Sequence, residues 1–276
     1  MINTSPLFIV STGRSGSYLM KELFKQELGI EIHHEYACTH TQEVAVKYYA
    51  GLMTYEQAKY AISRIHGAAI HYSKCAIWVD SSSKLSWLVD ILYDLYPNAK
   101  FIHIVRNGRK VVSSYYNKLG GECYDDYSVG VLSRYLVNPD IELAPPPEKK
   151  YWWCQPLMNT EAGNVFSSYD QFERICFHWR EVNQKILDSF KGIPKNQKLS
   201  VKFEELVASP VQLQTLVEFV GVRLSDRMTE LVKRPINVNV PKNFSLTPRQ
   251  EEQFCRMCSD MMDYFQYDNK EYGVQY

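Results

Sequence analysis

The residues best suited to chemistry lie near the N-terminus, in a turn rich in glycine and serine. The apolar run Leu7–Val10 leads into Ser11-Thr12-Gly13-Arg14-Ser15-Gly16-Ser17, and a helical pattern follows from Tyr18 to about Leu28. A strand that enters a helix through such a turn brings free backbone N–H groups together with the positive end of the helix dipole. Glycines let an anion approach the backbone closely, and the arginine and serines add donors. The turn predicts a phosphate-binding site.

The same turn excludes two familiar nucleotide-binding loops. A Walker A loop needs Gly-Lys-Ser/Thr, but here Gly16 is followed by Ser17 and Tyr18, and the first lysine is Lys21. The dinucleotide pattern Gly-x-Gly-x-x-Gly is also absent. Ordinary strand-to-helix turns use glycine and serine too, so the turn alone leaves a purely structural interpretation open.

A second segment favours the phosphate interpretation. Phe101–Val105 has the pattern of a buried strand, Arg106 stands where it ends, and Ser114 follows eight residues later on an expected helix. An arginine and a hydroxyl in this arrangement can hold one phosphate from two directions. Basic residues at a helix start oppose the helix dipole unless an anion lies nearby. Two such strand ends in one sheet predict a ligand that carries phosphate at both ends.

Together these segments resemble the sulfotransferases that use 3′-phosphoadenosine-5′-phosphosulfate (PAPS). Thr12–Ser17 resembles their 5′-phosphosulfate loop, in the arginine form of protein-tyrosine and many bacterial sulfotransferases. The run from Arg106 through Ser114 to Tyr116 resembles their 3′-phosphate motif. Val201–Leu206, followed by Phe219-Val220-Gly221, is similar to their Tyr-Glu-Asp-Leu strand and Phe-Leu-Gly helix end. The resemblance implies a bacterial small-molecule sulfotransferase that uses PAPS, releases PAP and requires no metal.

The resemblance also implies which residues bind the donor, and it marks three departures. Leu19 stands where cytosolic enzymes stack adenine on tryptophan, and Phe203 replaces the family tyrosine. The C-terminal Arg-Lys-Gly-x-x-Gly element is missing, and only Lys242-Asn243-Phe244 faintly resembles its end. The donor-binding residues implied are Gly13, Arg14, Ser15, Gly16, Ser17, Tyr18, Arg106, Ser114, Phe203 and Lys242.

Sulfuryl transfer needs a base for the acceptor, and three residues are candidates. Glu35, in His33-His34-Glu35-Tyr36, resembles the base-bearing segment of some bacterial carbohydrate sulfotransferases and is preferred. Asp80, at a strand end before Ser81, is the second choice, and His34 is the third. The alternative role for Glu35 is that of a charged loop residue, and the alternative role for Asp80 is that of a helix N-cap. Arg14 would stabilise the departing phosphate, with Lys84 or Arg109 assisting. The histidines around Glu35 match no metal template, so no metal site is expected.

Composition and pattern set the architecture. The 276 residues alternate strands and helices, which predicts a single α/β domain over 1–276, with a central parallel sheet flanked by helices and a P-loop-like strand–loop–helix. Arg14, Asp80 and Arg106 fall at strand ends and are expected to converge. Further helices are expected at 43–65, at 169–190, from Ser209-Pro210 to Val220 and from Thr247 onward.

Charge and apolar runs exclude some functions. Thirty-one basic residues balance 31 acidic ones, which argues against nucleic-acid binding. No apolar run reaches the ~20 residues of a membrane span, and a strand begins almost at the N-terminus, leaving no room for a signal peptide. The seven cysteines form no paired framework and indicate buried thiols. A cytoplasmic protein is expected, with a homodimer left open.

The stretch 120–168 lacks periodicity and is interpreted as an irregular cover of the acceptor site. It holds Trp152-Trp153 and the run Tyr124-Asp125-Asp126-Tyr127, whose aromatic and acidic side chains favour a polar or cationic acceptor. A guanidinium alkaloid of the saxitoxin type is one candidate on resemblance; sugars, phenols and lipids stay open, as does a packed surface excursion. The alternative function is a phosphate- or nucleotide-binding module, or a kinase-like P-loop protein, without sulfotransferase activity.

Overall fold

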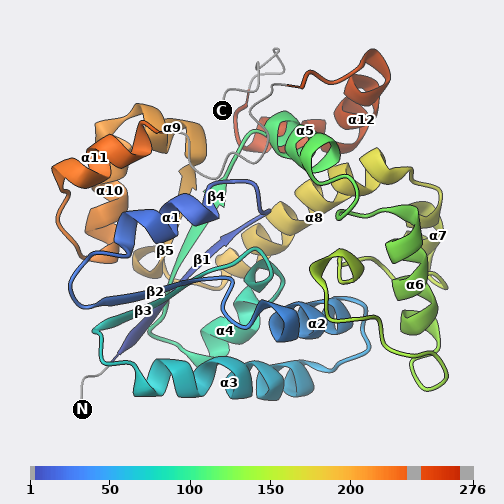
Figure 1. The fold of residues 1–276 in the computed structure, drawn as a ribbon, viewed down its shortest axis with the longest axis horizontal. Helices are drawn as coiled ribbons and strands as arrows, with labels where there is room; N and C mark the ends of the chain where they lie inside the picture. Colours follow the sequence, from blue (N-terminus) through green and yellow to red (C-terminus); the bar gives the residue numbers. More distant parts are fainter. Residues whose placement is uncertain (1–3, 235–243, 268–276) are drawn as a thin grey trace.

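A five-stranded sheet, in which all strands run parallel, forms the centre of the computed structural model (Figure 1). The structure describes residues 4–234 and 244–267. Across the sheet the spatial order is β2-β3-β1-β4-β5. The strands are β1 (Ser5–Ser11), β2 (Ile30–His34), β3 (Ile77–Ser81), β4 (Lys100–Val105) and β5 (Lys198–Lys202). The predicted single α/β domain with a central parallel sheet is confirmed.

Helices cover both faces of this sheet, because β1 buries side chains on each side. Leu7 and Ile9 pack on one face, in a core that includes α1, α10 and α11, whereas Phe8 and Val10 pack on the other with α3, α4 and α8. A strand buried on both faces has a continuous apolar sequence, as Leu7–Val10 does. These helices are α1 (Ser17–Phe24), α3 (Tyr55–Tyr72), α4 (Val89–Leu95), α8 (Gln171–Lys191), α10 (Pro210–Val220) and α11 (Asp226–Val232).

The remaining helices lie around this framework (Figure 1). They are α2 (Cys38–Tyr49), α5 (Gly108–Lys118), α6 (Asp126–Val137), α7 (Glu161–Ser167), α9 (Phe203–Ala208) and α12 (Pro248–Tyr264), with short 3-10 turns η1 (Leu85–Trp87), η2 (Lys149–Tyr151) and η3 (Lys195–Gln197). Among the described residues, no helix combines the length and the apolarity needed to cross a membrane.

The expected helix starts near the C-terminus are confirmed by their caps. The Ser209 side chain accepts a hydrogen bond from the N–H of Gln212, with Pro210 at the first helical position of α10. Thr247 and Gln250 form a reciprocal capping box at the start of α12. These local signals act within four residues and are therefore readable from sequence.

The elements differ from the expectations in three places. The helical region expected at 43–65 is present as two helices, separated near Gly51, whose φ of +77° breaks the first, and Thr54 caps the second. α1 ends at Phe24 rather than near Leu28. β2 was not predicted, because an edge strand of alternating Ile30, Glu31, Ile32 and His33 is only half buried.

The stretch 120–168 also holds more regular structure than expected. The Asp125 side chain accepts from the N–H of Ser128 and starts α6, and Thr160 caps α7 in the same way. The acidic run interpreted as part of an irregular cover is therefore in part a helix start. Between the two helices, residues 138–160 contain only the short turn η2.

All five strands end at the same edge of the sheet, since they are parallel. The segment Thr12–Gly16 follows β1, Glu35 follows β2, Ser82 to Lys84 follow β3, Arg106 follows β4 and Phe203 follows β5. In open parallel sheets, ligands bind at this carboxyl edge. The fold thus collects residues from 12 to 203 around one place.

Candidate functional site: a basic cavity at the carboxyl edge of the sheet

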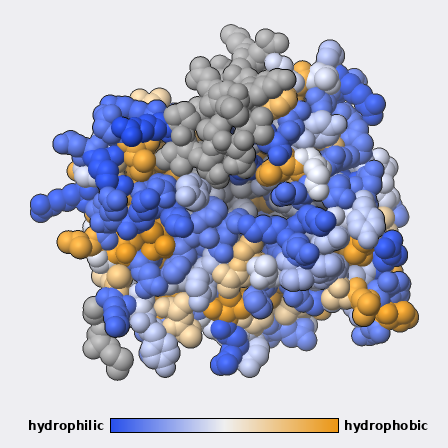
Figure 2. Space-filling view, in the orientation of Figure 1, coloured by the Kyte–Doolittle hydropathy of each residue, from blue (hydrophilic) through white to orange (hydrophobic). Residues whose placement is uncertain are grey.

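A cavity of about 770 Å³ opens at this edge, lined by residues that follow all five strands. Figure 2 shows a hollow near the middle of this face, bordered largely by hydrophilic residues. Its described lining carries eight basic side chains, from Arg14, Lys84, Arg106, Lys110, Lys118, Lys149, Lys233 and Arg234, and only three acidic ones, from Glu35, Glu122 and Glu204. The chain as a whole is neutral, so the positive charge is a property of this place.

The loop after β1 is shaped to bind an anion. Gly13, Arg14 and Gly16 all have positive φ, of 76°, 53° and 100°. α1 has no side-chain cap at its N-terminus, and among the described residues the amide N–H groups of Arg14 to Ser17 donate to no protein acceptor. A Cβ at Gly16 would overlap the ring of Phe203. Glycine is thus required both by conformation and by contact.

Not every residue of the loop faces the cavity. Gly13, Arg14, Gly16, Ser17 and Tyr18 line it, and their contacts with a donor stay predictions. Ser15 is fully buried instead, with its Oγ 2.8 Å from the Thr12 Oγ1 and donating to the Gly13 carbonyl at 3.0 Å. The expectation that its hydroxyl serves a ligand was wrong, because the left-handed turn rotates this side chain into the protein. Ser15 stabilises the loop from within.

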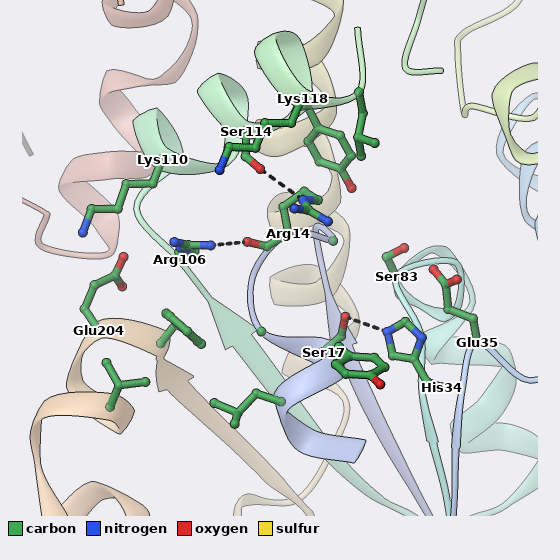
Figure 3. Close-up of a pocket in the computed structure, with 18 of the residues that line it drawn as sticks. Arg14, Ser17, His34, Glu35, Ser83, Arg106, Lys110, Ser114, Lys118 and Glu204 are labelled. Atoms are coloured by element: carbon green, nitrogen blue, oxygen red, sulfur yellow. Dashed lines mark hydrogen bonds between the residues drawn. The ribbon is translucent and has the colours of Figure 1, made fainter. Parts of the chain in front are cut away.

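The two predicted phosphate-binding segments meet through their arginines (Figure 3). Arg106 donates from Nη1 to the Arg14 carbonyl at 2.7 Å, and Arg14 donates from Nε to the Ser114 Oγ at 3.1 Å. The Arg106 guanidinium also lies 4.9 Å from the centre of the Phe203 ring. Its buried Nε has no hydrogen-bond partner among the described residues. That donor is available to a bound anion.

Electrostatics at this end of the cavity also favour an anion. Burial, opposed by Glu204 and reinforced by Arg14, lowers the pKa of Arg106. Burial likewise lowers the pKa of Lys110, and burial together with the charges of Arg14 and Arg106 lowers that of Lys118. Cations held close together in a partly buried site repel one another, and a bound anion would relieve that cost.

Lys110, Lys118 and Glu204 were not predicted as site residues. Lys110 and Lys118 stand four residues before and after Ser114, so they share one face of α5. That spacing was a readable signal. Glu204 accepts from the Asn107 N–H at 3.1 Å and from the Tyr267 hydroxyl at 2.8 Å, contacts that only the fold reveals.

Phe203 and Lys242 are the last two residues predicted to contact the donor. Phe203 directly follows β5 and opens α9, and it lines the cavity between Gly16 and Arg106. Lys242 lies outside the described residues, so its role stays a prediction.

Glu35 and His34 face the opposite end of the cavity from Lys110 and Glu204 (Figure 3). Glu35 has a φ of 58° and forms an ion pair with Lys149 of η2. Burial would raise the pKa of Glu35, but Lys149, aided by His34 and Lys84, lowers it overall. His34 lies 3.2 Å from the Ser17 Oγ through Nε2, and burial lowers its pKa. A carboxylate and a neutral imidazole thus stand side by side.

Asp80 does not line the cavity, and its predicted convergence with Arg14 and Arg106 was wrong. It is fully buried; its Oδ1 accepts from the Tyr36 N–H at 3.1 Å, and its Oδ2 lies 3.4 Å from the His66 Nε2. Side chains alternate along β3, so Asp80 points to the same face as Trp78, away from the loop. Burial, partly offset by His66, raises the pKa of Asp80.

Of the two assisting residues expected, only one faces the cavity. Lys84 lines it, with Nζ 4.1 Å from the centre of a Trp153 ring and 3.5 Å from the Trp152 carbonyl. Arg109 instead donates to Glu251 of α12 at 2.7 Å and lies outside the cavity lining. Among the described residues, no three His, Cys, Asp or Glu side chains are grouped as a metal site would require.

The segment 120–168, interpreted from the sequence as a cover of the acceptor site, contributes fewer residues to the cavity than expected. Trp153, Glu122 and Lys149 line it, but Trp152 is buried in the core. No residue of the run Tyr124-Asp125-Asp126-Tyr127 does so: Tyr124 is fully buried, Asp125 caps α6, Asp126 contacts Arg174 and Tyr127 is exposed. The acidic and aromatic run that favoured a cationic acceptor is therefore not part of the described cavity lining.

Comparison with known proteins identifies the fold. A model described as the sulfotransferase family matches residues 6–136. No curated protein matches the sequence. A sulfotransferase domain from the olefin synthase of Synechococcus PCC 7002 is similar in structure (TM-score 0.53, 17% identity), with 97% of each chain covered.

Two further solved structures are similar at comparable distance. A sulfotransferase from Alicyclobacillus acidocaldarius gives a TM-score of 0.50 at 15% identity, with 96% of each chain covered. A sulfotransferase from Mycobacterium avium gives 0.52 at 11% identity and covers 96% of this chain and 78% of its own. The likeness in fold extends over the C-terminal half, beyond the residues that the family model matches.

Proposed function

We propose that this chain, which a sulfotransferase family model matches over residues 6–136 and which shares its fold with solved sulfotransferases, transfers the sulfuryl group of PAPS to a hydroxyl or amine of a small molecule. The observation that carries the proposal is the pairing of two anion-binding elements on one cavity. The loop after β1 and the junction of β4 with α5 meet through Arg14 and Arg106. A donor with phosphate at both ends of an adenosine requires two such elements side by side.

The residues present fit this donor. The free N–H groups of the loop suit the 5′-phosphosulfate, and the buried Arg106 Nε, with Ser114 and Lys110, suits the 3′-phosphate. Phe203, Val207 and Ala208 add apolar surface for the adenine ring of the donor. The lowered pKa of Arg106 and of its lysine neighbours would return toward ordinary values once phosphates bind.

PAPS, when bound, supplies a sulfuryl group: the acceptor oxygen or nitrogen forms a bond to sulfur while the S–O bond to the 5′-phosphate breaks, and its electron pair remains on the phosphate of PAP. Glu35 takes the proton that the acceptor loses. Arg14 and the loop N–H groups stabilise charge on the departing phosphate. Lys84 adds a positive charge on the acceptor side of the loop.

Glu35 is the preferred base because it lines the cavity as a carboxylate. His34, next to it, is the remaining candidate. Asp80 is buried on the other face of the sheet, and its contacts suit the support of the Tyr36 backbone rather than proton transfer. The experiment that separates them compares Glu35→Gln with His34→Asn at equal PAP affinity.

The acceptor is proposed only by class. Trp153 and Glu122 supply an aromatic and an acidic surface near Glu35, but Lys84 and Lys149 lie there as well. This lining supports a polar acceptor and gives a cation, such as a saxitoxin-type alkaloid, no preference over a sugar or a phenol. We expect turnover of a polar acceptor in a panel with labelled PAPS; turnover of sterols or long-chain lipids alone would contradict this.

Ligand-induced stabilisation tests the donor, since a ligand that binds the native state raises its apparent stability. We expect PAP to raise the melting temperature without magnesium, and 5′-AMP, which lacks the 3′-phosphate, to raise it less. Stabilisation by Mg-ATP or Mg-GTP but not by PAP would favour the alternative, a kinase-like P-loop protein or phosphate-binding module.

A further inference from the structure

The loop after β1 holds a conformation that needs support from outside. Gly13, Arg14 and Gly16 are left-handed within four residues, and Arg14 pays a steric cost that glycine would not. A loop of this kind keeps one shape only when its surroundings fix it. The contacts of the Thr12 peptide, which enters the turn, supply such support.

The Thr12 carbonyl, at the entrance to the turn, accepts two hydrogen bonds. The Tyr115 hydroxyl donates to it at 2.9 Å from α5, and the His178 imidazole reaches it through Nε2 at 2.9 Å from α8. His178 comes from a helix 166 residues away in sequence and lies outside the cavity lining. It therefore acts on the loop from behind.

His178 is suited to donate at all ordinary pH values. It is almost completely buried, and burial lowers its pKa to about 3. A neutral imidazole that faces a carbonyl through Nε2 carries its proton there, which leaves Nδ1 as an acceptor. The Tyr124 hydroxyl oxygen lies 3.3 Å from Nδ1, but it donates its single proton to the Cys154 carbonyl at 2.7 Å and so does not also donate to His178.

We propose that His178 is a positioning residue for donor binding. By holding the Thr12 carbonyl in the protein interior, it sets the rotation of the turn, in which the N–H groups of Arg14 to Ser17 donate to no described protein acceptor. The same imidazole lies 5.2 Å from a Trp153 ring, which lines the acceptor side. One buried group thus supports both walls of the site. This inference rests on the proposed use of PAPS.

The chain supplies a matched control in His103. This histidine of β4 is also fully buried, bonds through Nε2 to the Asn183 Oδ1 at 3.0 Å, and has a pKa lowered by burial to about 4. It does not contact the loop. Replacing either histidine with phenylalanine removes a buried hydrogen bond, but only His178→Phe removes one from the Thr12 carbonyl, which then keeps the bond from Tyr115 alone.

The experiment measures stability by urea unfolding, and PAP affinity by calorimetry under conditions in which every variant is folded. We expect His178→Phe and His103→Phe both to lose stability, and only His178→Phe to bind PAP more weakly, by about tenfold or more. His178→Gln, whose amide can donate at a similar reach, should recover most of the affinity. His178→Asn, whose amide is one carbon shorter, should not.

Two outcomes overturn the inference, and they differ. Wild-type protein that binds no PAP removes the proposed function and this inference with it. Wild-type protein that binds PAP, with His178→Phe binding as tightly as His103→Phe, removes the positioning role and leaves the function standing. If His178→Phe does not fold, the comparison rests on His178→Asn and His178→Gln. Equal PAP affinity of these two variants would then overturn the inference.

Discussion

Arg14 and Arg106 each connect one anion-binding element to the other. Replacing either with alanine removes a charge and also a contact that orders its neighbour. We expect Arg14→Ala and Arg106→Ala to weaken PAP binding by ~2–4 kcal/mol each. Calorimetric titration measures this, and Arg64→Ala, at an exposed position of α3, is the control. Unchanged affinity in either variant would separate that arginine from the phosphates.

Glu35 and Lys149 form the second contact that matters at the residue scale. Lys149 holds the pKa of Glu35 below its usual value although burial opposes this. In Lys149→Met the largest influence opposing burial is lost and only His34 and Lys84 still oppose it, so the pKa of Glu35 rises and the base is protonated at higher pH. We expect the acidic limb of the pH–rate profile to move upward in that variant.

Rates measured from pH 4.5 to 8 with the acceptor found in the panel test this expectation. Lys149→Arg should restore the wild-type profile, and Lys150→Met, whose parent side chain contacts Tyr151 instead, should leave it unchanged. A loss of rate that is equal at every pH would assign Lys149 a structural role. Glu35→Gln should abolish turnover with PAP binding intact.

Sequence alone predicted the residues whose signals are local. Arg106 directly follows an apolar strand, Arg14 stands in the short glycine turn after another, and Ser114 lies eight residues after Arg106. Asp80 was misplaced because a strand end fixes the edge of the sheet but not the face to which a side chain points. Lys149 and His178 were not predicted, since only tertiary packing brings them to Glu35 and Thr12.

At the scale of elements, the glycine turn can be tested with a matched pair. Gly16 and Gly29 both have positive φ, but a Cβ at Gly16 would overlap Phe203, whereas none of the described atoms lies within 4 Å of one at Gly29. We expect both alanine variants to lose about 1 kcal/mol of stability from backbone strain. Only Gly16→Ala should also weaken PAP binding.

Urea unfolding and PAP titration of the two variants measure these effects separately. Equal PAP affinity in both variants would show that Phe203 can move without consequence for the donor. The comparison removes backbone strain as an explanation, because both positions share it.

Elements with strong periodicity were predicted well, and short or polar ones were not. β1, β3, β4 and β5 are apolar or flanked by clear turns, and α8 buries a continuous face. β2 and α6 were not predicted from the sequence. β2 is a half-buried edge strand, and α6 begins in an acidic run whose composition is typical of a loop. Both depend on caps and neighbours that lie outside a helix or strand period.

For the whole molecule, the two buried histidines predict sensitivity to acid. His103 and His178 have folded-state pKa values of about 4 and about 3, below the ordinary 6.5. Below pH 6.5 the two imidazoles therefore bind protons in the unfolded chain but stay neutral in the folded chain. Each histidine should cost about 1.4 kcal/mol of stability per pH unit as the pH falls below that value.

Urea unfolding at pH 7.5, 6.5 and 5.5 measures this loss. We expect little change between the first two values and a loss of about 3 kcal/mol by pH 5.5, of which His103→Phe should remove about half. Stability that stays constant to pH 5.5 would mean that these imidazoles accept protons without unfolding.

The concentration of positive charge in the cavity has a kinetic consequence. A neutral chain attracts no anion from a distance by its net charge, but eight basic side chains against three acidic ones create a local field at the mouth of the site. Such a field guides an anion during diffusion and raises its association rate, and dissolved salt screens it. Capture of a highly charged nucleotide should therefore slow as ionic strength rises, while its escape, governed by short-range contacts, changes far less.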